Sequence, residues 1–138
     1  MNWLAWALLS AGFAGLTALL AKIGVQHVDS NVATAIRTTV VVVFAWGVAL
    51  VVNRPSVGTI APRTWLFLTL SGLATGCSWL CYFRALQLGD VAQVAPIDKL
   101  SVVVAVILAA LFLGETLTAL HWLGVGLIVA GTIVLASA

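Results

Sequence analysis

Long apolar stretches alternate with short polar connections along this chain. Five stretches carry apolar side chains almost without interruption, at about residues 3–23, 32–52, 65–86, 91–113 and 117–135. A helix of roughly 20 apolar residues crosses the hydrocarbon core of a bilayer. The apolar residues are continuous and do not alternate with period two, which favours helices over the strands of a membrane barrel. The pattern predicts an all-α membrane protein with five transmembrane helices, in which residues 1–138 form a single domain.

Composition agrees with a chain that has lipid as its solvent. Of the residues, 63% are hydrophobic and only 7% are charged, whereas roughly a quarter are charged in soluble domains. No Lys or Arg precedes the first stretch and four more spans follow it, so we expect a retained helix and not a signal peptide. The six Lys and Arg residues form no basic cluster, which excludes nucleic acid as a partner.

The distribution of cations leaves the orientation in the membrane weakly specified. With five spans, Arg54 and Arg63 fall on the side of the N-terminus, while Lys22 and Arg84 fall on or near the opposite side. Cytoplasmic loops normally hold a clear excess of Lys and Arg. Near-balance therefore predicts insertion in both orientations. The alternative is a single orientation in which the only long connection, Asn53–Thr64, is cytoplasmic.

Ionisable residues inside the predicted spans are the first candidates for function, because such residues are costly in lipid. They are Arg37, Arg84, Asp98 and Lys99, all expected in the half of the membrane opposite the N-terminus. In one interpretation Asp98 pairs with one of the two arginines and Lys99 extends to the headgroups. In the other, Asp98 is a protonatable or cation-holding carboxylate, and the cations are its counter-charges or bind anions.

Pro96 directly precedes this charged pair. A proline inside a helix removes a backbone hydrogen bond and kinks the chain. The carbonyl left free is a possible ligand, and interrupted helices near charged groups are typical of transporter sites.

A polar stripe is predicted on the third helix. Its members, at spacings of four, three and four, are Ser71, Thr75, Ser78 and Tyr82. Such spacings place side chains on one helical face. The stripe either forms hydrogen bonds across a helix interface or lines a water-filled path together with Trp79. We expect Gly72 and Gly76 on the same helix to allow close helix packing.

Nothing in the sequence favours an enzyme or a cofactor. The two cysteines, Cys77 and Cys81, are interpreted as small packing residues, since a metal site needs more ligands than two thiols. The two histidines, His27 and His121, are predicted on opposite sides of the membrane, and no nucleophile, base and orienting third group can be assembled around either. No phosphate-binding glycine motif is present, so direct use of ATP is not expected.

The segment from Cys81 to Leu135 contains a series of short motifs. They are Ala-Leu-Gln-x-Gly at 85–89, Ala-Pro at 95–96, Leu-Phe-Leu-Gly-Glu at 111–115, Leu-Thr at 117–118, Trp-x-Gly at 122–124 and Ala-Gly at 130–131. In these motifs the segment resembles the EamA unit of the drug/metabolite transporter superfamily. Most members of that family carry two such five-helix units in tandem, whereas this chain resembles the minority with one.

The resemblance implies a secondary transporter in the cytoplasmic membrane of a prokaryote, a multi-pass protein that exports small polar metabolites by alternating access. Tandem five-helix units insert in opposite orientations and enclose a central site, so a single unit is expected to pair with an inverted copy as an antiparallel homodimer. The partners expected are a small-molecule substrate, membrane lipid and a second copy. Two alternatives stay open: a flippase or flippase subunit for a lipid-linked sugar, and a non-transporting helper subunit of another membrane protein.

Overall fold

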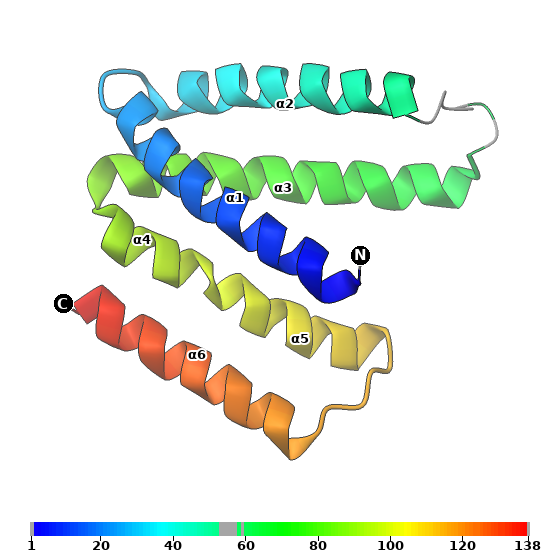
Figure 1. The fold of residues 1–138 in the computed structure, drawn as a ribbon, viewed down its shortest axis with the longest axis vertical. Helices are drawn as coiled ribbons and strands as arrows, with labels where there is room; N and C mark the ends of the chain where they lie inside the picture. The colour runs from blue at the N-terminus through cyan, green and yellow to red at the C-terminus, as the bar shows by residue number, and fades with distance from the viewer. Residues whose placement is uncertain (1, 53–57, 59, 138) are drawn as a thin grey trace. The chain divides into compact units, whose positions relative to one another are not determined.

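A computed structural model describes residues 2–52, 58 and 60–137. Its elements are α1 (Trp3–Val25), α2 (Ser30–Val52), α3 (Pro62–Leu88), α4 (Val91–Asp98), α5 (Leu100–Phe112) and α6 (Ala119–Ser137). All regular structure in the described ranges is helical (Figure 1). Within the described residues, five segments are long and apolar enough to cross a membrane, with α4 and α5 together forming the fourth. The prediction of an all-α protein with five transmembrane helices is confirmed.

The observed helix ends differ from the apolar boundaries because polar groups set them. The carboxylate of Asp29 accepts backbone N–H bonds from Asn31 and Val32 at 2.9 and 3.3 Å, so α2 begins at Ser30. Aspartate is a favoured residue at this position, because its side chain satisfies amides that have no partner inside the helix. α3 begins at Pro62, since a proline in the first helical turn has no N–H to satisfy. Arg54 and Pro55 of the predicted long connection lie outside the described residues.

The fourth span is broken where the charged pair occurs. α4 ends at Asp98 and α5 begins at Leu100. The carbonyl of Pro96 accepts the N–H of Lys99, three residues further on, at 3.0 Å. This three-residue spacing is that of a tight 3₁₀ turn, whereas a regular α-helix bonds residues four apart. The interruption expected at Pro96 is therefore centred on Lys99, one turn further along the span.

The chain divides into two compact units. One, which we call the middle unit, comprises Ala21–Gln87; the other, the outer unit, comprises Met1–Leu20 together with Leu88–Ala138. In the outer unit α4 and α5 both pack against α6 (Figure 1). In the middle unit α2 and α3 lie side by side, and the end of α3 is bonded to the end of α1. The single-domain prediction for residues 1–138 stays a prediction.

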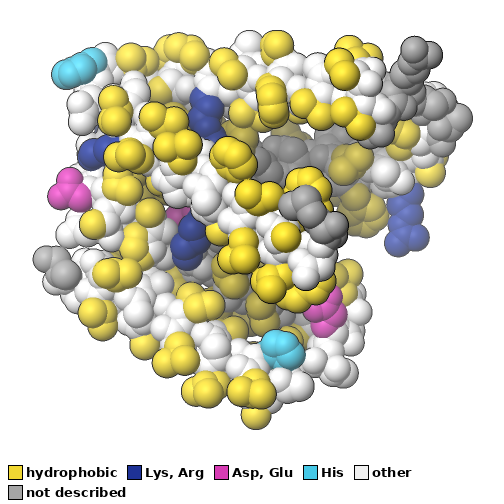
Figure 2. Space-filling model, in the orientation of Figure 1, with side chains coloured by type: hydrophobic (Ala, Val, Ile, Leu, Met, Phe, Trp, Pro, Cys, Tyr) yellow, Lys and Arg dark blue, Asp and Glu magenta, His cyan; other side chains and the backbone are white. Residues whose placement is uncertain are grey.

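Large apolar side chains are widely exposed on the helices, as expected when the surrounding solvent is hydrocarbon. Figure 2 shows hydrophobic side chains spread over the visible face, with few charged groups among them. Cys77 and Cys81, expected to pack between helices, are exposed free thiols. A Cβ atom added at Gly72 or Gly76 would meet no atom within 4 Å. These glycines therefore do not bring two helices together in the described part of the chain.

Candidate transport site

An arginine in the middle unit lies over two aromatic rings. The guanidinium carbon of Arg37 on α2 is 4.1 Å from the ring centroid of Trp79 and 5.5 Å from that of Phe83, both on α3. A cation over an aromatic face is stabilised by about 0.5–1 kcal/mol at an exposed site and by about 2 kcal/mol or more when it is desolvated. Arg37 and Trp79 are half-buried and Phe83 is buried. We call these three residues the aromatic cradle.

The cradle brings together two residues predicted from the sequence and adds a third. Arg37 and Trp79 were both candidates, and the structure brings them into contact. Phe83 was missed. Its sequence signal is the spacing of four from Trp79, which places both rings on one face of α3.

The charge of Arg37 is not balanced by a carboxylate within its own unit. Asp29 is the one acidic residue among residues 21–87, and its carboxylate caps the start of α2. Among the described residues of this unit, Arg37 is held by aromatic faces, which leave the edge of the guanidinium group, with its N–H donors, available. A guanidinium in this setting can receive the carboxylate or phosphate of a solute.

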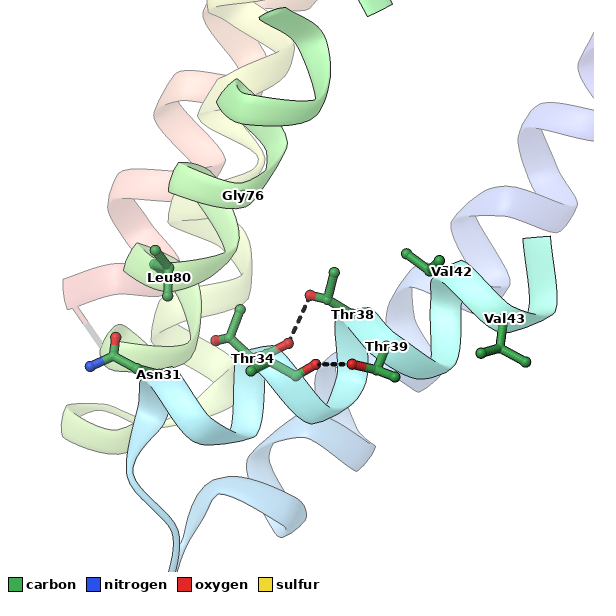
Figure 3. A pocket seen from close by; sticks show the side chains of 9 residues that line it. Asn31, Thr34, Thr38, Thr39, Val42, Val43, Gly76 and Leu80 are labelled. Atoms are coloured by element: carbon green, nitrogen blue, oxygen red, sulfur yellow. Dashed lines mark hydrogen bonds between the residues drawn. The ribbon is translucent and has the colours of Figure 1, made fainter. Parts of the chain in front are cut away.

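A groove runs along α2 and α3 in two adjoining cavities. The first, which we call the trough, has a volume of about 410 Å³ and is lined by Asn31, Thr34, Ala35, Thr38, Thr39, Val42, Val43, Gly76 and Leu80 (Figure 3). The second, which we call the mouth, has a volume of about 500 Å³ and is lined by Asp29, Ser30, Asn31, Leu80, Cys81 and Arg84. Asn31 and Leu80 line both cavities, so trough and mouth adjoin each other.

Arg84 lies at the mouth and not in the cradle. Its Nη1 donates to Oε1 of Gln87 at 3.0 Å, and Nε2 of Gln87 in turn donates to the carbonyls of Val25 and Val28 at 3.2 and 2.7 Å. This chain of bonds fixes Gln87 against the turn between α1 and α2. The guanidinium of Arg84 is itself exposed.

Asp98 and Lys99 occur at the break in the fourth span. Nζ of Lys99 is 3.4 Å from Oδ2 of Asp98, and the two side chains are 57% and 35% exposed respectively. Neighbouring residues on a helix point about 100° apart, and the backbone at Lys99 stays in the right-handed helical region. The long side chain of Lys99 therefore bends back to reach the carboxylate of Asp98. Arg37 and Arg84 belong to the other unit, so their pairing with Asp98 stays a prediction.

The carbonyl of Pro96 has a second partner on α6. Besides the N–H of Lys99, it accepts the hydroxyl of Thr132 at 3.4 Å. Thr132 is 6% exposed and lines a cavity of about 380 Å³ with Ile97 and Leu100. Sequence reasoning missed this residue, whose one signal is a hydroxyl in the apolar interior of α6. The broken span is therefore anchored to α6 next to its charged pair.

The polar stripe lies on a different face of α3 from the trough. Ser71, Thr75 and Ser78 are exposed and Tyr82 is half-buried. Thr75 donates its hydroxyl hydrogen bond to the carbonyl of Ser71 in the same helix, at 2.9 Å. The residues of α3 that line the trough, Gly76 and Leu80, are about 100° round the helix from Thr75 and Trp79 respectively. Whether the stripe forms an interface or a water path stays a prediction.

The sequence matches the EamA-like transporter family over residues 1–137. The chain belongs to this family. It is also similar to a Sinorhizobium sp. protein described as an uncharacterized transporter in the cobO 3′ region. The two are 57% identical over 136 residues, which cover 98% of this chain and 96% of the relative. No solved structure matches the chain. The resemblance identified from residues 81–135 is confirmed, and the protein is a multi-pass membrane transporter.

For an EamA-like transporter, the two units supply different chemistry. The middle unit offers a fixed positive charge on an aromatic face, which can bind an anionic or zwitterionic solute. The outer unit offers a carboxylate and an amine at a broken helix, groups that can bind ions or exchange protons with water.

Thr118 and His121, at the start of α6, bond to each other and to each other's backbone N–H. This pair acts as a helix cap.

Proposed function

We propose that the protein is a secondary exporter of small polar metabolites, which works by alternating access in the cytoplasmic membrane. The observation that carries the proposal is the position of Arg37. It holds a full positive charge within a spanning helix, over Trp79 and Phe83, with no carboxylate partner among the described residues of its unit. An intramembrane charge is expensive and normally serves a substrate or ion path.

The proposed transporter is an antiparallel homodimer. The family match extends once along the chain, over residues 1–137, and the Sinorhizobium relative is also about one unit long, since 96% of it aligns. Two five-helix units in opposite orientations form an inverted repeat with a site between them. The near-balance of cations on the two sides supports insertion in both orientations.

In the proposed cycle Arg37 holds the anionic part of the solute, and the indole ring of Trp79 packs against its apolar part. Asp98 and Lys99 supply the second charged locus, where the carboxylate takes up and releases a proton or cation as the site alternates between the two sides. Pro96 and the break after it give the fourth span a place to bend. The polar stripe of α3 contributes hydroxyls to the wall of the same path.

Flux measurements in proteoliposomes test the proposal. The probes are radiolabelled small carboxylates and zwitterions, with Arg37→Gln compared with the unaltered protein. A matched control is Arg63→Gln, because Arg63 also lies over an aromatic ring, that of Phe67 at 5.8 Å, but near the start of α3. We expect Arg37→Gln to abolish flux and Arg63→Gln to preserve it. Undiminished flux with Arg37→Gln in a folded protein would contradict the proposal.

A further inference from the structure

The trough and the mouth together form one groove with an apolar shaft and a charged end. The shaft is made by Val42, Val43, Leu80, the bare backbone of Gly76 and three threonines. Thr34, Thr38 and Thr39 each donate their hydroxyl to the carbonyl four residues earlier, at 2.8, 2.7 and 3.0 Å. Figure 3 shows the bonds of Thr38 and Thr39. Their donors are therefore satisfied within α2, and the shaft offers little to water or to a polar solute.

The length of the shaft corresponds to one leaflet of the membrane. From Asn31 to Val43 the chain advances 12 residues, which is about 18 Å of helix. A single leaflet contributes about 15 Å of hydrocarbon. The mouth is formed by the first residues of α2 and by Arg84, four residues before the end of α3 at Leu88. It therefore lies near the level of the lipid headgroups, and the shaft descends towards the bilayer centre.

The mouth carries two opposite charges that do not form an ion pair with each other. Asp29 and Arg84 line the same cavity, both are exposed, and no contact within 4.0 Å joins them in the described part of the chain. Oδ1 of Asp29 is occupied by the N–H groups of Asn31 and Val32, while Oδ2 can still accept. Nη1 of Arg84 is bonded to Gln87, which leaves four of its five N–H donors.

We propose that this groove binds one membrane phospholipid with a primary-ammonium headgroup. Its phosphate lies on Arg84, its ammonium on Asp29, and one acyl chain fills the trough as far as Val43. A zwitterionic headgroup complements both charges at once, whereas a purely anionic headgroup would leave the carboxylate unmatched. The lipid site is distinct from the aromatic cradle, because Arg37, Trp79 and Phe83 line neither the trough nor the mouth. Arg84 is thereby assigned to lipid and Arg37 to solute.

Photo-crosslinking in liposomes tests this assignment with the full chain. The probes are phosphatidylethanolamine, phosphatidylcholine and phosphatidylglycerol with the same diazirine-labelled acyl chain, and adducts are mapped by mass spectrometry. We expect adducts concentrated between Thr34 and Val43 and between Gly76 and Leu80, with phosphatidylethanolamine labelling best. Arg84→Gln should weaken binding of all three lipids about tenfold. Asp29→Asn, which keeps the helix cap, should remove only the preference for phosphatidylethanolamine.

A variant that fills the trough with a larger side chain provides a second test of the lipid site. Gly76→Leu places a side chain in the groove at a position where a Cβ meets nothing within 4 Å, so labelling of the trough should fall severalfold. Gly72→Leu is the matched control, since its Cβ is equally free and Gly72 does not line the trough. Labelling spread evenly around α2, or equal for the three headgroups, would overturn the proposal. So would crosslinks from the trough to a second copy of the chain in place of lipid.

Discussion

Nζ of Lys22, near the end of α1, donates a hydrogen bond of 2.8 Å to the backbone carbonyl of Leu86, which is 64 residues further along the chain. The last carbonyls of a helix have no partner inside it and carry the negative end of its dipole. In return, the side-chain amide of Gln87 on α3 donates to the carbonyls of Val25 and Val28. The ends of α1 and α3 therefore cap each other, and Val25 and Leu86 beside them are 1% and 0% exposed.

Removing this mutual cap should destabilise the middle unit. Lys22→Met keeps the length of the side chain and deletes its charge, so we expect the free energy of unfolding to fall by about 1.5–3 kcal/mol, the range for hydrogen bonds to charged groups. Gln87→Met should have a smaller effect, and the double variant should be non-additive because both bonds hold the same two ends together. Thermal unfolding in detergent measures these changes. Additive losses would mean that the two bonds act separately.

The aromatic cradle gives a prediction that separates packing from charge. Trp79→Leu keeps an apolar side chain but removes the ring under Arg37, so we expect a loss of about 0.5–2 kcal/mol from the cation–π contact and reduced flux. In the Arg37→Met background the same change should cost less stability, because the cation is already absent. Phe67→Leu, under Arg63, is the control for flux. An equal loss in both backgrounds would show that Trp79 acts by packing alone.

Asp98 can be tested for a role in coupling solute flux to a proton or cation, because its ion-pair partner Lys99 is exposed. The side chain of Asp98 is 35% exposed and that of its ion-pair partner Lys99 is 57% exposed. In the proposed water-filled path, such a pair contributes at most about 1 kcal/mol. Asp98→Asn should therefore abolish flux while leaving thermal stability nearly unchanged. Lys99→Gln should be about as stable as the unaltered protein.

The competing interpretation, in which Asp98 neutralises an arginine, predicts a different result. Asp98→Asn would then leave a cation without its partner and lower stability strongly, and adding Arg37→Gln would restore much of it. Flux and thermal unfolding measured for both variants distinguish the two cases. Normal flux with Asp98→Asn would remove this carboxylate from the transport mechanism.

Orientation in the membrane can be measured directly. A reporter fused to the C-terminus should be found on both sides of the membrane in comparable amounts, because Lys and Arg are nearly balanced between the two sides. Two lysines added to the Asn53–Thr64 connection should shift the population towards one orientation. If more than about nine-tenths of the unaltered protein faces one side, the antiparallel homodimer cannot form in the proposed way.

The sequence by itself determined the fold class, the five spans and the family. Whether a segment can span the membrane depends on that segment alone. Each helix makes its own backbone hydrogen bonds in lipid and needs only enough consecutive apolar residues. The motifs between Ala85 and Gly131 are local too, and the family match over residues 1–137 bears them out. Helix ends were less well predicted, because side chains such as that of Asp29 extend a helix beyond its apolar part.

Only the tertiary structure decided which side chains meet. Apart from the polar stripe of α3, the spans are apolar on nearly all sides, so the sequence does not show which side of a helix packs against a neighbour. Arg37 over Phe83, Lys22 on the carbonyl of Leu86 and Thr132 on that of Pro96 each depend on the rotation of one helix against another. That rotation is set by the fit of side chains distant in sequence, and spacing along one helix does not contain it.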